Sequence, residues 1–192
     1  MLAPDALARL FFDARTPNGW LNRPVSRELV ERIYDAARLG PTSMNSAPAR
    51  FVFLHSEEAK RRLEPLLSPR NVEKAMAAPL IAIVGSDRNF VDLLPRLWLR
   101  DVQALFVERP GLREETAQRN ATLQGAYLIM AARAFGLDCG PMSGFDAALV
   151  DAAFFAGTAI RTDFICCLGY ADRSTVGPRL VRLSFDEACR WE

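Results

Sequence analysis

The sequence predicts a single domain that combines α-helices with buried β-strands. Three short apolar runs, at 51–54, 79–85 and 164–169, are rich in branched or aromatic residues, as expected for strands of a core sheet. Segments with helical periodicity lie between them. Half of the 192 residues are hydrophobic, and no linker, repeat or low-complexity segment interrupts them. Residues 1–192 are therefore expected to form one domain around one core.

The predicted helices begin at residues whose side chains can accept hydrogen bonds from free backbone N–H groups. Gly40-Pro41 should end the second helix, and Pro65 the third. The fourth is short and should run through Met76. We expect N-caps at Asp5, Ser26, Ser56, Asn71, Asp146 and Ser184, the last in a capping box with Glu187.

The longest predicted helix covers 114–135 and ends at Gly136. Beyond Asn120 it is apolar on nearly all sides, so it belongs at the centre of the molecule or in an oligomer interface. Just before it, the segment 86–112 loses periodicity and mixes Leu and Trp with arginines. We expect an irregular excursion with a helical piece there, a candidate lid or dimer contact.

Charge and cysteine content argue against several function classes. The formal net charge of +1 gives no reason to expect nucleic acid or an anionic membrane as a partner. The four cysteines lack C-x-x-C spacing and are expected to be buried free thiols. His55 is the single histidine, which leaves no histidine-rich metal site, and we expect it at an exposed strand end. Without a signal peptide or a long apolar run, the protein is expected to be soluble and cytoplasmic.

Three loops, at 13–20, 40–50 and 137–145, concentrate small and polar residues. The loop 40–50 joins a predicted helix directly to a predicted strand and brings four hydroxyl or amide side chains to the junction. Because binding groups commonly lie on fixed loops of a rigid scaffold, this loop is the main candidate for a ligand site. The alternative is an ordered connector whose polar groups are satisfied by its own Asx and Ser/Thr turns.

The usual catalytic motifs are missing: the sequence has no G-x-S-x-G, no P-loop and no G-x-G-x-x-G after a strand. Small residues in the three loops would let a flat ring approach the backbone. Arg15, with Arg179 or Arg182, could hold a phosphate through forked donors. This combination indicates a cofactor that carries its own chemistry. Taken singly, each arginine fits a solvated surface charge better.

Six groups of motifs occur in one order over nearly the whole chain. They are Ala14-Arg15-Thr16 with 18–20, Gly40-Pro41-Thr42-Ser43 with Asn45 and 48–50, Asn120 with Gln124 and 126–129, 136–138 with 140–146, 153–157, and 182–185 with 187–189. As a set they resemble the flavin-dependent nitroreductase family, and within it the malonic semialdehyde reductase group of pyrimidine catabolism.

The resemblance implies an α+β fold, a nitroreductase-like three-layer α/β/α sandwich with a central mixed sheet. It also implies an intertwined homodimer with two FMN sites at its interface. NADH or NADPH would reduce the flavin, and a small-molecule substrate would then take up the hydride in a ping-pong cycle. Rate would come from positioning and from the flavin itself, so no side chain is assigned as catalytic and no metal is expected.

The site residues are carried over from the family by position. Near the phosphate the resemblance implies Arg15, with Thr16 and Pro17 alongside, and Arg179 as a second ligand. Gly177 replaces a basic residue of the family, and Arg182 can compensate for it. The residues that would contact the flavin ring or line its pocket are Ser43, Asn45, Asn71, Lys74, Pro141, Met142, Ser143 and Gly144.

Lys74 has a chemical reason to lie beside the flavin. Hydride uptake leaves negative charge at the pyrimidine edge of the ring, which a preset cation stabilises. An ordinary exposed helix lysine is the alternative. The backbone of Pro141, Met142, Ser143 and Gly144 would pack near N5 and the dimethylbenzene side.

Three further positions depart from the family pattern. Ala47 and Ala49 replace Gln and Trp of many members, and Ser143 replaces a Glu of some, which argues against transferring a nitroaromatic preference. We therefore expect an FMN-dependent NAD(P)H oxidoreductase that reduces malonic semialdehyde, with Arg50 or an arginine of 86–112 near the substrate carboxylate. The alternatives are a broad nitroaromatic or quinone reductase, a non-catalytic flavin-binding protein, and a cofactor-free dimerisation domain.

Overall fold

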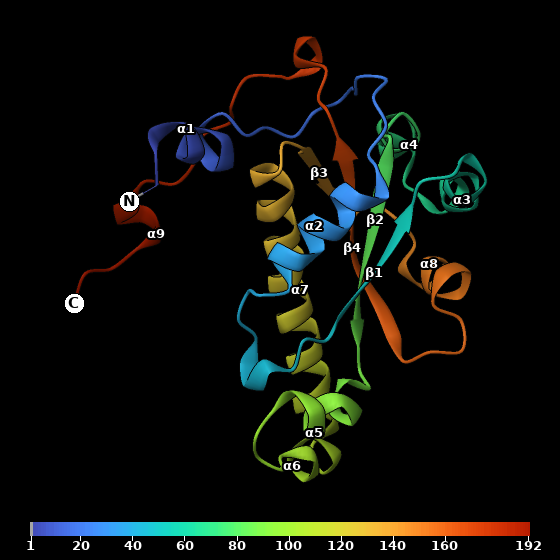
Figure 1. Cartoon of the computed structure of the whole chain (residues 1–192), viewed down its shortest axis with the longest axis vertical. Coiled ribbons are helices and arrows are strands. Elements are labelled where there is room, and N and C mark those ends of the chain that lie inside the picture. Colours follow the sequence, from blue (N-terminus) through green and yellow to red (C-terminus); the bar gives the residue numbers. More distant parts are fainter. Residues whose placement is uncertain (1) are drawn as a thin grey trace.

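The computed structural model describes residues 2–192 and places one four-stranded sheet between two helical layers (Figure 1). The strand order is β1-β2-β4-β3. The strands are β1 (Ala49–Leu54), β2 (Leu80–Asp87), β3 (Asp138–Met142) and β4 (Ile160–Gly169). All three pairings are antiparallel. The predicted three-layer α+β fold is therefore confirmed, but the sheet that residues 2–192 form is antiparallel and not mixed.

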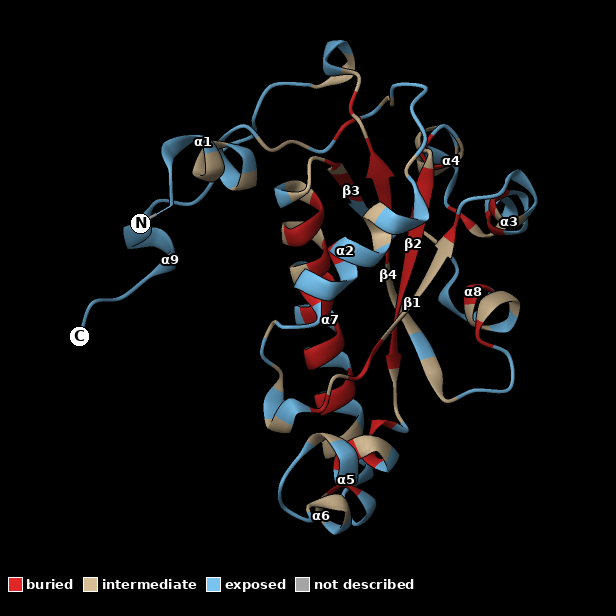
Figure 2. Ribbon diagram, in the orientation of Figure 1, coloured by how far each residue is buried: buried red, intermediate tan, exposed pale blue. Residues whose placement is uncertain are grey.

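Two hydrophobic clusters hold the helices on opposite faces of the sheet. On one face pack α2 (Arg27–Ala37) and α7 (Pro110–Ala134), with Ile33 and Leu128 in the cluster. On the other face pack α3 (Glu57–Leu63), α4 (Pro69–Met76) and α8 (Ala147–Phe154). The adjacent residues Cys166 and Cys167 belong to different clusters, because successive strand residues point to opposite faces. Buried residues accordingly line the sheet and one side of α7 (Figure 2).

The remaining helical elements are short. The α-helical pieces are α1 (Pro4–Leu7), α5 (Leu94–Leu97), α6 (Gln103–Val107) and α9 (Phe185–Ala188). A π-helical turn covers Ala8–Phe12, and 3-10 turns cover Ser43–Asn45, Glu64–Leu66, Phe90–Leu93 and Arg173–Thr175. The expected irregular excursion at 86–112 is confirmed as the region of α5 and α6. None of the helices within residues 2–192 is long and apolar enough to cross a membrane.

Four of the predicted N-caps are confirmed, at Ser26, Ser56, Asp146 and Ser184, and the last forms the expected capping box. The caps predicted at Asp5 and Asn71 are wrong. Both residues lie inside helices, α1 and α4, that begin with a proline. Proline at the first position lacks the N–H that a cap would satisfy and already has helical φ, so these helices start earlier than expected.

Two strand predictions also need correction. The expected loop 137–145 contains β3, which tolerates Pro141 because β3 is an edge strand that pairs with β4 on one side only. The run 51–54 was expected to be a buried strand, but Phe51, Val52 and Phe53 are only half-buried. They belong to β1, the other edge of the sheet, whose outer side has no strand neighbour among residues 2–192.

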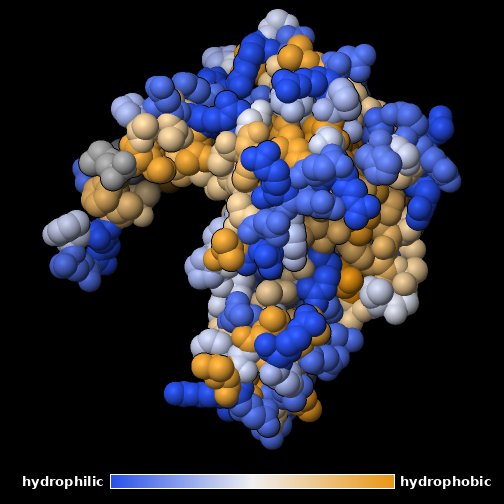
Figure 3. Space-filling view, in the orientation of Figure 1, coloured by the Kyte–Doolittle hydropathy of each residue, from blue (hydrophilic) through white to orange (hydrophobic). Residues whose placement is uncertain are grey.

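The segment after β4 leaves the body of the molecule. Residues 176–192 run away from the sheet in a largely extended path that includes α9 (Figure 1). Leu180, Val181 and Leu183 are 78%, 94% and 69% exposed. Figure 3 shows apolar surface where this segment projects from the molecule beside α1. Cys189 lies in it and is exposed, whereas Cys139, Cys166 and Cys167 are buried free thiols as predicted.

Candidate functional site

Most of the predicted site residues gather at the sheet end where β4 finishes. The loop 13–20 lies across this end, because Trp20 bridges to Ala171 and its indole Nε1 donates to the Lys74 carbonyl at 2.9 Å. A side chain at Gly140 would contact Trp20 at 3.5 Å and Thr16 at 3.9 Å. We call the residues here the β4-end group: Arg15, Thr16, Pro17, Asn71, Lys74, Pro141, Met142, Ser143, Gly144 and Arg179.

The loop after β3 is held against α4 by its backbone. The Gly144 carbonyl accepts from the Asn71 side-chain amide at 2.9 Å and from the Ser68 N–H at 3.0 Å. A Cβ at Gly144 would lie 2.5 Å from Asn71 Nδ2, so a side chain there would displace the amide from this hydrogen bond. Ser143 is exposed, while the Met142 side chain is buried in the core. The part of this loop that is open to a ligand is therefore mainly backbone.

Two arginines of the group join the chain termini. Arg15 donates to the Gly177 carbonyl, and Arg179 donates to the Ala14 carbonyl at 3.1 Å. Neither guanidinium has a carboxylate within ion-pair distance in the described part of the chain. Two neighbouring cations without an acid to neutralise them suit a bound anion such as a phosphate. Arg182 lies apart and donates only to the nearby carbonyls of Leu180 and Val181.

Ser43 and Asn45 lie at the opposite end of the sheet. Ala49, which follows their loop, pairs with Ser86 of β2, while Leu80 at the other end of β2 pairs with Leu168 of β4. At about 3.3 Å per strand residue, these two ends of β2 are roughly 20 Å apart. Within one chain, two of the three predicted loops therefore meet and the loop 40–50 does not join them.

Three polar side chains of α7 fix the loop 40–50. Asn120 Oδ1 accepts from the Ser43 N–H at 2.8 Å, and Gln124 Oε1 accepts from the Ala49 N–H at 2.9 Å. The Tyr127 hydroxyl donates to the Pro41 carbonyl at 2.8 Å. Sequence reasoning gave these residues no role beyond a motif. Their spacing of four and three on an otherwise apolar helix places them on one face, and that signal could have found them.

The backbone of this loop is strained. Met44, Asn45 and Ala47 have φ values of 52°, 48° and 40°, in the left-handed region that L-residues rarely adopt. Each such residue costs roughly 1–2 kcal/mol and persists only where surrounding contacts impose it. Met44 packs on the cluster that contains Phe90 and Leu94, and the Asn45 amide donates to the Leu97 carbonyl at 3.0 Å. The loop is held by these elements and also by its own Ser/Thr turn, in which Thr42 Oγ1 accepts from the Ala47 N–H at 3.1 Å. Both the ligand site and the ordered connector therefore stay predictions.

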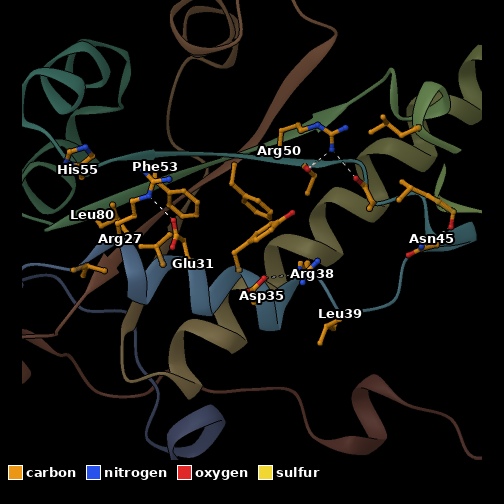
Figure 4. A pocket seen from close by; sticks show the side chains of 18 of the residues that line it. Arg27, Glu31, Asp35, Arg38, Leu39, Asn45, Arg50, Phe53, His55 and Leu80 are labelled. Carbon is orange, nitrogen blue, oxygen red and sulfur yellow. Dashed lines mark hydrogen bonds and ion pairs between the residues drawn. The ribbon is translucent and has the colours of Figure 1, made fainter. Parts of the chain in front are cut away.

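A groove of about 1390 Å³ runs between α2 and β1 to this loop (Figure 4). Exposed His55 lies near one end of it, as predicted for a surface strand end, and Asn45 lies near the other. Tyr34, Phe51 and Phe53 give the groove aromatic walls. A large opening therefore lies beside the loop 40–50.

The buried cysteines do not supply a nucleophile. Burial raises the pKa of the Cys167 thiol to about 12, against a smaller opposing effect of Lys74 and Lys60. Hydrogen bonding with Cys139, and then burial, raise the pKa of Cys166 well above its usual value. A thiol that stays protonated at neutral pH is inert as a nucleophile. The candidate site is thus a set of binding groups.

Comparison with known proteins gives one consistent result. A model of the Nitroreductase family matches residues 19–170. A protein of Ralstonia pickettii named "Putative NADH dehydrogenase/NAD(P)H nitroreductase HadB" is 55% identical over 193 residues, covering 98% of this chain and 98% of that protein.

Solved structures agree in fold. A nitroreductase family protein from Streptococcus pneumoniae TIGR4 superposes with a TM-score of 0.85 at 19% identity, over 97% of this chain and 100% of that chain. A protein of Exiguobacterium sibiricum 255-15, solved in complex with FMN, superposes with a TM-score of 0.82 at 22% identity, over 100% of this chain and 99% of that chain. These likenesses confirm the predicted nitroreductase-like fold.

Proposed function

This chain belongs to the nitroreductase family, and from that premise we propose that it is an FMN-dependent NAD(P)H oxidoreductase that reduces malonic semialdehyde to 3-hydroxypropionate. The observation that carries the cofactor assignment is the pair of arginines, Arg15 and Arg179, that link the loop 13–20 to the tail and have no acidic partner among residues 2–192. When bound, FMN accepts a hydride from NADH or NADPH and delivers it to the second substrate.

The β4-end group fits FMN by its chemistry. On binding, Arg15 and Arg179 would donate to phosphate oxygens in place of their present backbone carbonyls. A charged phosphate accepts two parallel hydrogen bonds from a guanidinium, which are stronger than bonds to a neutral carbonyl. Thr16 and Pro17 would lie alongside them, with Arg182 as a further tail cation. Lys74, whose ammonium has no ion-pair partner among residues 2–192, would stabilise negative charge at the pyrimidine edge.

The ring itself would meet two surfaces. On one side, the backbone of 141–144 is accessible because Gly144 lacks a side chain and Met142 turns into the core. Asn71 fixes that backbone through the Gly144 carbonyl and keeps its own oxygen free as an acceptor. On the other side, Ser43 and Asn45 would close the pocket, but in one chain they precede β1 while 141–144 lie at the end of β3, and these strands are opposite edges of the sheet, roughly 14 Å apart at about 4.8 Å per strand.

A second copy of the chain is therefore part of the proposal. The loop 40–50 of one protomer would complete the β4-end group of its partner in a homodimer. The projecting tail supports this arrangement, because Val181 and Leu183 are 94% and 69% exposed and a monomer rarely leaves such a patch uncovered. The free edge of β1 is where a partner's tail could add a strand, which would leave the end of the groove at the loop 40–50 for ligands. A tail strand parallel to β1 would make the sheet mixed.

The acceptor is proposed to be a small aldehyde because Ala47 and Ala49 are small at the positions where many family members have Gln and Trp, and both line the groove at the loop 40–50. A second candidate is a broad nitroaromatic or quinone reductase, which the name of the Ralstonia pickettii relative favours. The two candidates share the flavin and differ in the oxidant. A cytoplasmic location accompanies either one as a proposal.

An absorbance spectrum of the purified protein tests the cofactor, and anaerobic addition of NADH or NADPH tests the reductant. We expect a flavin spectrum that bleaches, and then reoxidation by malonic semialdehyde faster than by a nitroaromatic or a quinone. The reverse order would favour the second candidate. A flavin that NADH and NADPH cannot bleach would leave only a flavin-binding protein. A colourless protein whose melting temperature ignores added FMN would refute the proposal, since a specific ligand raises stability.

A further inference from the structure

One arginine in the groove differs from the others. Arg27 pairs with Glu31 at 2.8 Å, Arg38 with Asp35 at 2.9 Å and Arg50 with Asp87 at 2.7 Å. These pairs cancel most of the positive charge along α2 and β1 (Figure 4). Arg96 also lines the groove, and it makes no ion pair or side-chain hydrogen bond with any residue in 2–192. It is thus the uncompensated guanidinium of this cavity.

Arg96 lies at the end of the groove that contains the loop 40–50. It belongs to α5, whose next residue, Leu97, accepts a hydrogen bond from the Asn45 amide at 3.0 Å. Leu94 of the same helix is buried against Phe90 and Phe106, so α5 is a fixed support and not a loose loop. The free cation therefore faces the same cavity as a residue proposed to line the flavin pocket.

Arg50 was the other candidate for binding an anionic substrate, and its contacts argue against that role. Beyond its ion pair with Asp87, its Nη1 donates to the carbonyls of Ala47 and Ala49 at 3.1 and 2.9 Å. To bind a ligand, the guanidinium would have to abandon a half-buried carboxylate and release a strained loop. Its contacts make Arg50 a positioning residue for the loop.

We propose that Arg96 is a specificity-determining residue that binds the carboxylate of the acceptor substrate. This inference rests on the proposed function and extends it, since it selects small aldehydes that carry an acid over neutral ones. A guanidinium binds a carboxylate through two parallel N–H donors, which orients the aldehyde as well as holding it. No internal carboxylate in the described chain competes for this fork, so substrate binding breaks no existing ion pair.

The test uses the FMN-loaded protein and two probes, malonate and neutral malonamide, in calorimetric titrations. Malonate should bind the wild type more tightly than malonamide does. The Arg96→Gln exchange removes the charge and should weaken malonate binding roughly 10- to 100-fold, the range expected for a hydrogen bond to a charged group. Arg96→Lys should recover part of the loss. Arg100→Gln is the matched control, because this exposed arginine of the same excursion does not line the groove.

Steady-state kinetics give the second readout. In Arg96→Gln the KM for malonic semialdehyde should rise, while the KM for propanal and for the nicotinamide cofactor stays unchanged. Equal changes for the charged and neutral aldehydes would overturn the inference, as would malonate that fails to bind the wild type. A rise in KM for NADPH alone would also overturn it, by assigning Arg96 to a nucleotide phosphate. Should the wild type reduce no aldehyde, the proposed function would fail, and the malonate titration would still decide on Arg96.

Discussion

Removing the amide of Asn120 should release the loop 40–50 without replacing any residue that is proposed to contact the flavin. In Asn120→Ala the Ser43 N–H loses its acceptor at 2.8 Å, and the Thr116 carbonyl loses a second donor at 2.8 Å. The carbonyl keeps its helical N–H partner, so the main loss is the part-buried Ser43 donor. A buried donor left without an acceptor costs about 1–3 kcal/mol. The free energy of unfolding should fall by that amount.

The same change should weaken the binding of FMN. The strained left-handed residues 44, 45 and 47 would relax once the anchor is gone, and binding would have to restore their geometry. If the whole cost of 1–3 kcal/mol appears in binding, the Kd for FMN rises by roughly 5- to 150-fold, since about 1.4 kcal/mol corresponds to a factor of ten.

Two measurements check this prediction. Chemical denaturation of the apoprotein gives the change in stability, and quenching of flavin fluorescence gives the Kd for FMN. Gln118→Ala is the matched control, because Gln118 is an exposed amide on α7 whose side chain makes no hydrogen bond within residues 2–192. It should change neither quantity.

The reasoning would be refuted by a variant that loses stability and still binds FMN with the Kd of the wild type. In that case the loop would be a structural connector, and Ser43 and Asn45 would not belong to the flavin site. A variant with unchanged stability would refute the hydrogen-bond argument itself.

Three further predictions use the same protein. Arg50→Ala should lower the free energy of unfolding by about 1–3 kcal/mol, because it leaves the half-buried carboxylate of Asp87 unpaired. It should change the KM for charged and neutral acceptors by the same factor. A change in the KM for the charged acceptor alone would indicate that Arg50 binds the substrate. Gly144→Ala places a Cβ 2.5 Å from an amide nitrogen and should raise the Kd for FMN in fluorescence titrations, whereas Gly111→Ala, which meets nothing within 4 Å, should not. Folded protein should react with a thiol reagent at Cys189 only, because the other three thiols are buried. Burial raises the pKa of Cys167 from 9.0 to about 12, so its protonated form should contribute fully to the free energy of unfolding below pH 9. That contribution should be lost as the pH rises toward 12, which denaturation across this range would detect.

Local signals predicted helix starts well where a side chain makes the cap. Each capping side chain accepts a hydrogen bond from the backbone N–H three residues ahead, so both partners lie within a short stretch of sequence. The residues are Ser26, Ser56, Asp146 and Ser184. The two failures occurred where proline starts the helix without any cap. The strand β3 was missed because Gly140 and Pro141 have low strand propensity, and only its place beside β4 at the sheet edge makes them acceptable.

Buried polar residues of α7 show a different limit. Periodicity indicated an apolar, central helix, and α7 is central, yet Asn120 and Gln124 are buried there at 3% and 6% exposure. Their partners are loop N–H groups 77 and 75 residues away in the chain. A single sequence does not indicate that two such distant residues form a hydrogen bond, because packing over the whole sheet sets the position of the helix relative to the loop.

The sequence by itself determined the family, most of the helices, three of the four strands and a list of candidate ligand residues, since these depend on composition, short-range spacing and recognisable motifs. Only the tertiary structure decided that the β4-end group assembles within one chain while Ser43 and Asn45 lie at the far end of the sheet. It also decided that Arg50 is held by Asp87 whereas Arg96 is free. The physical reason is that ion pairing of an arginine, and the meeting of separate loops at one site, depend on distances in space. The antiparallel register of the four strands fixes these distances, and local propensity does not.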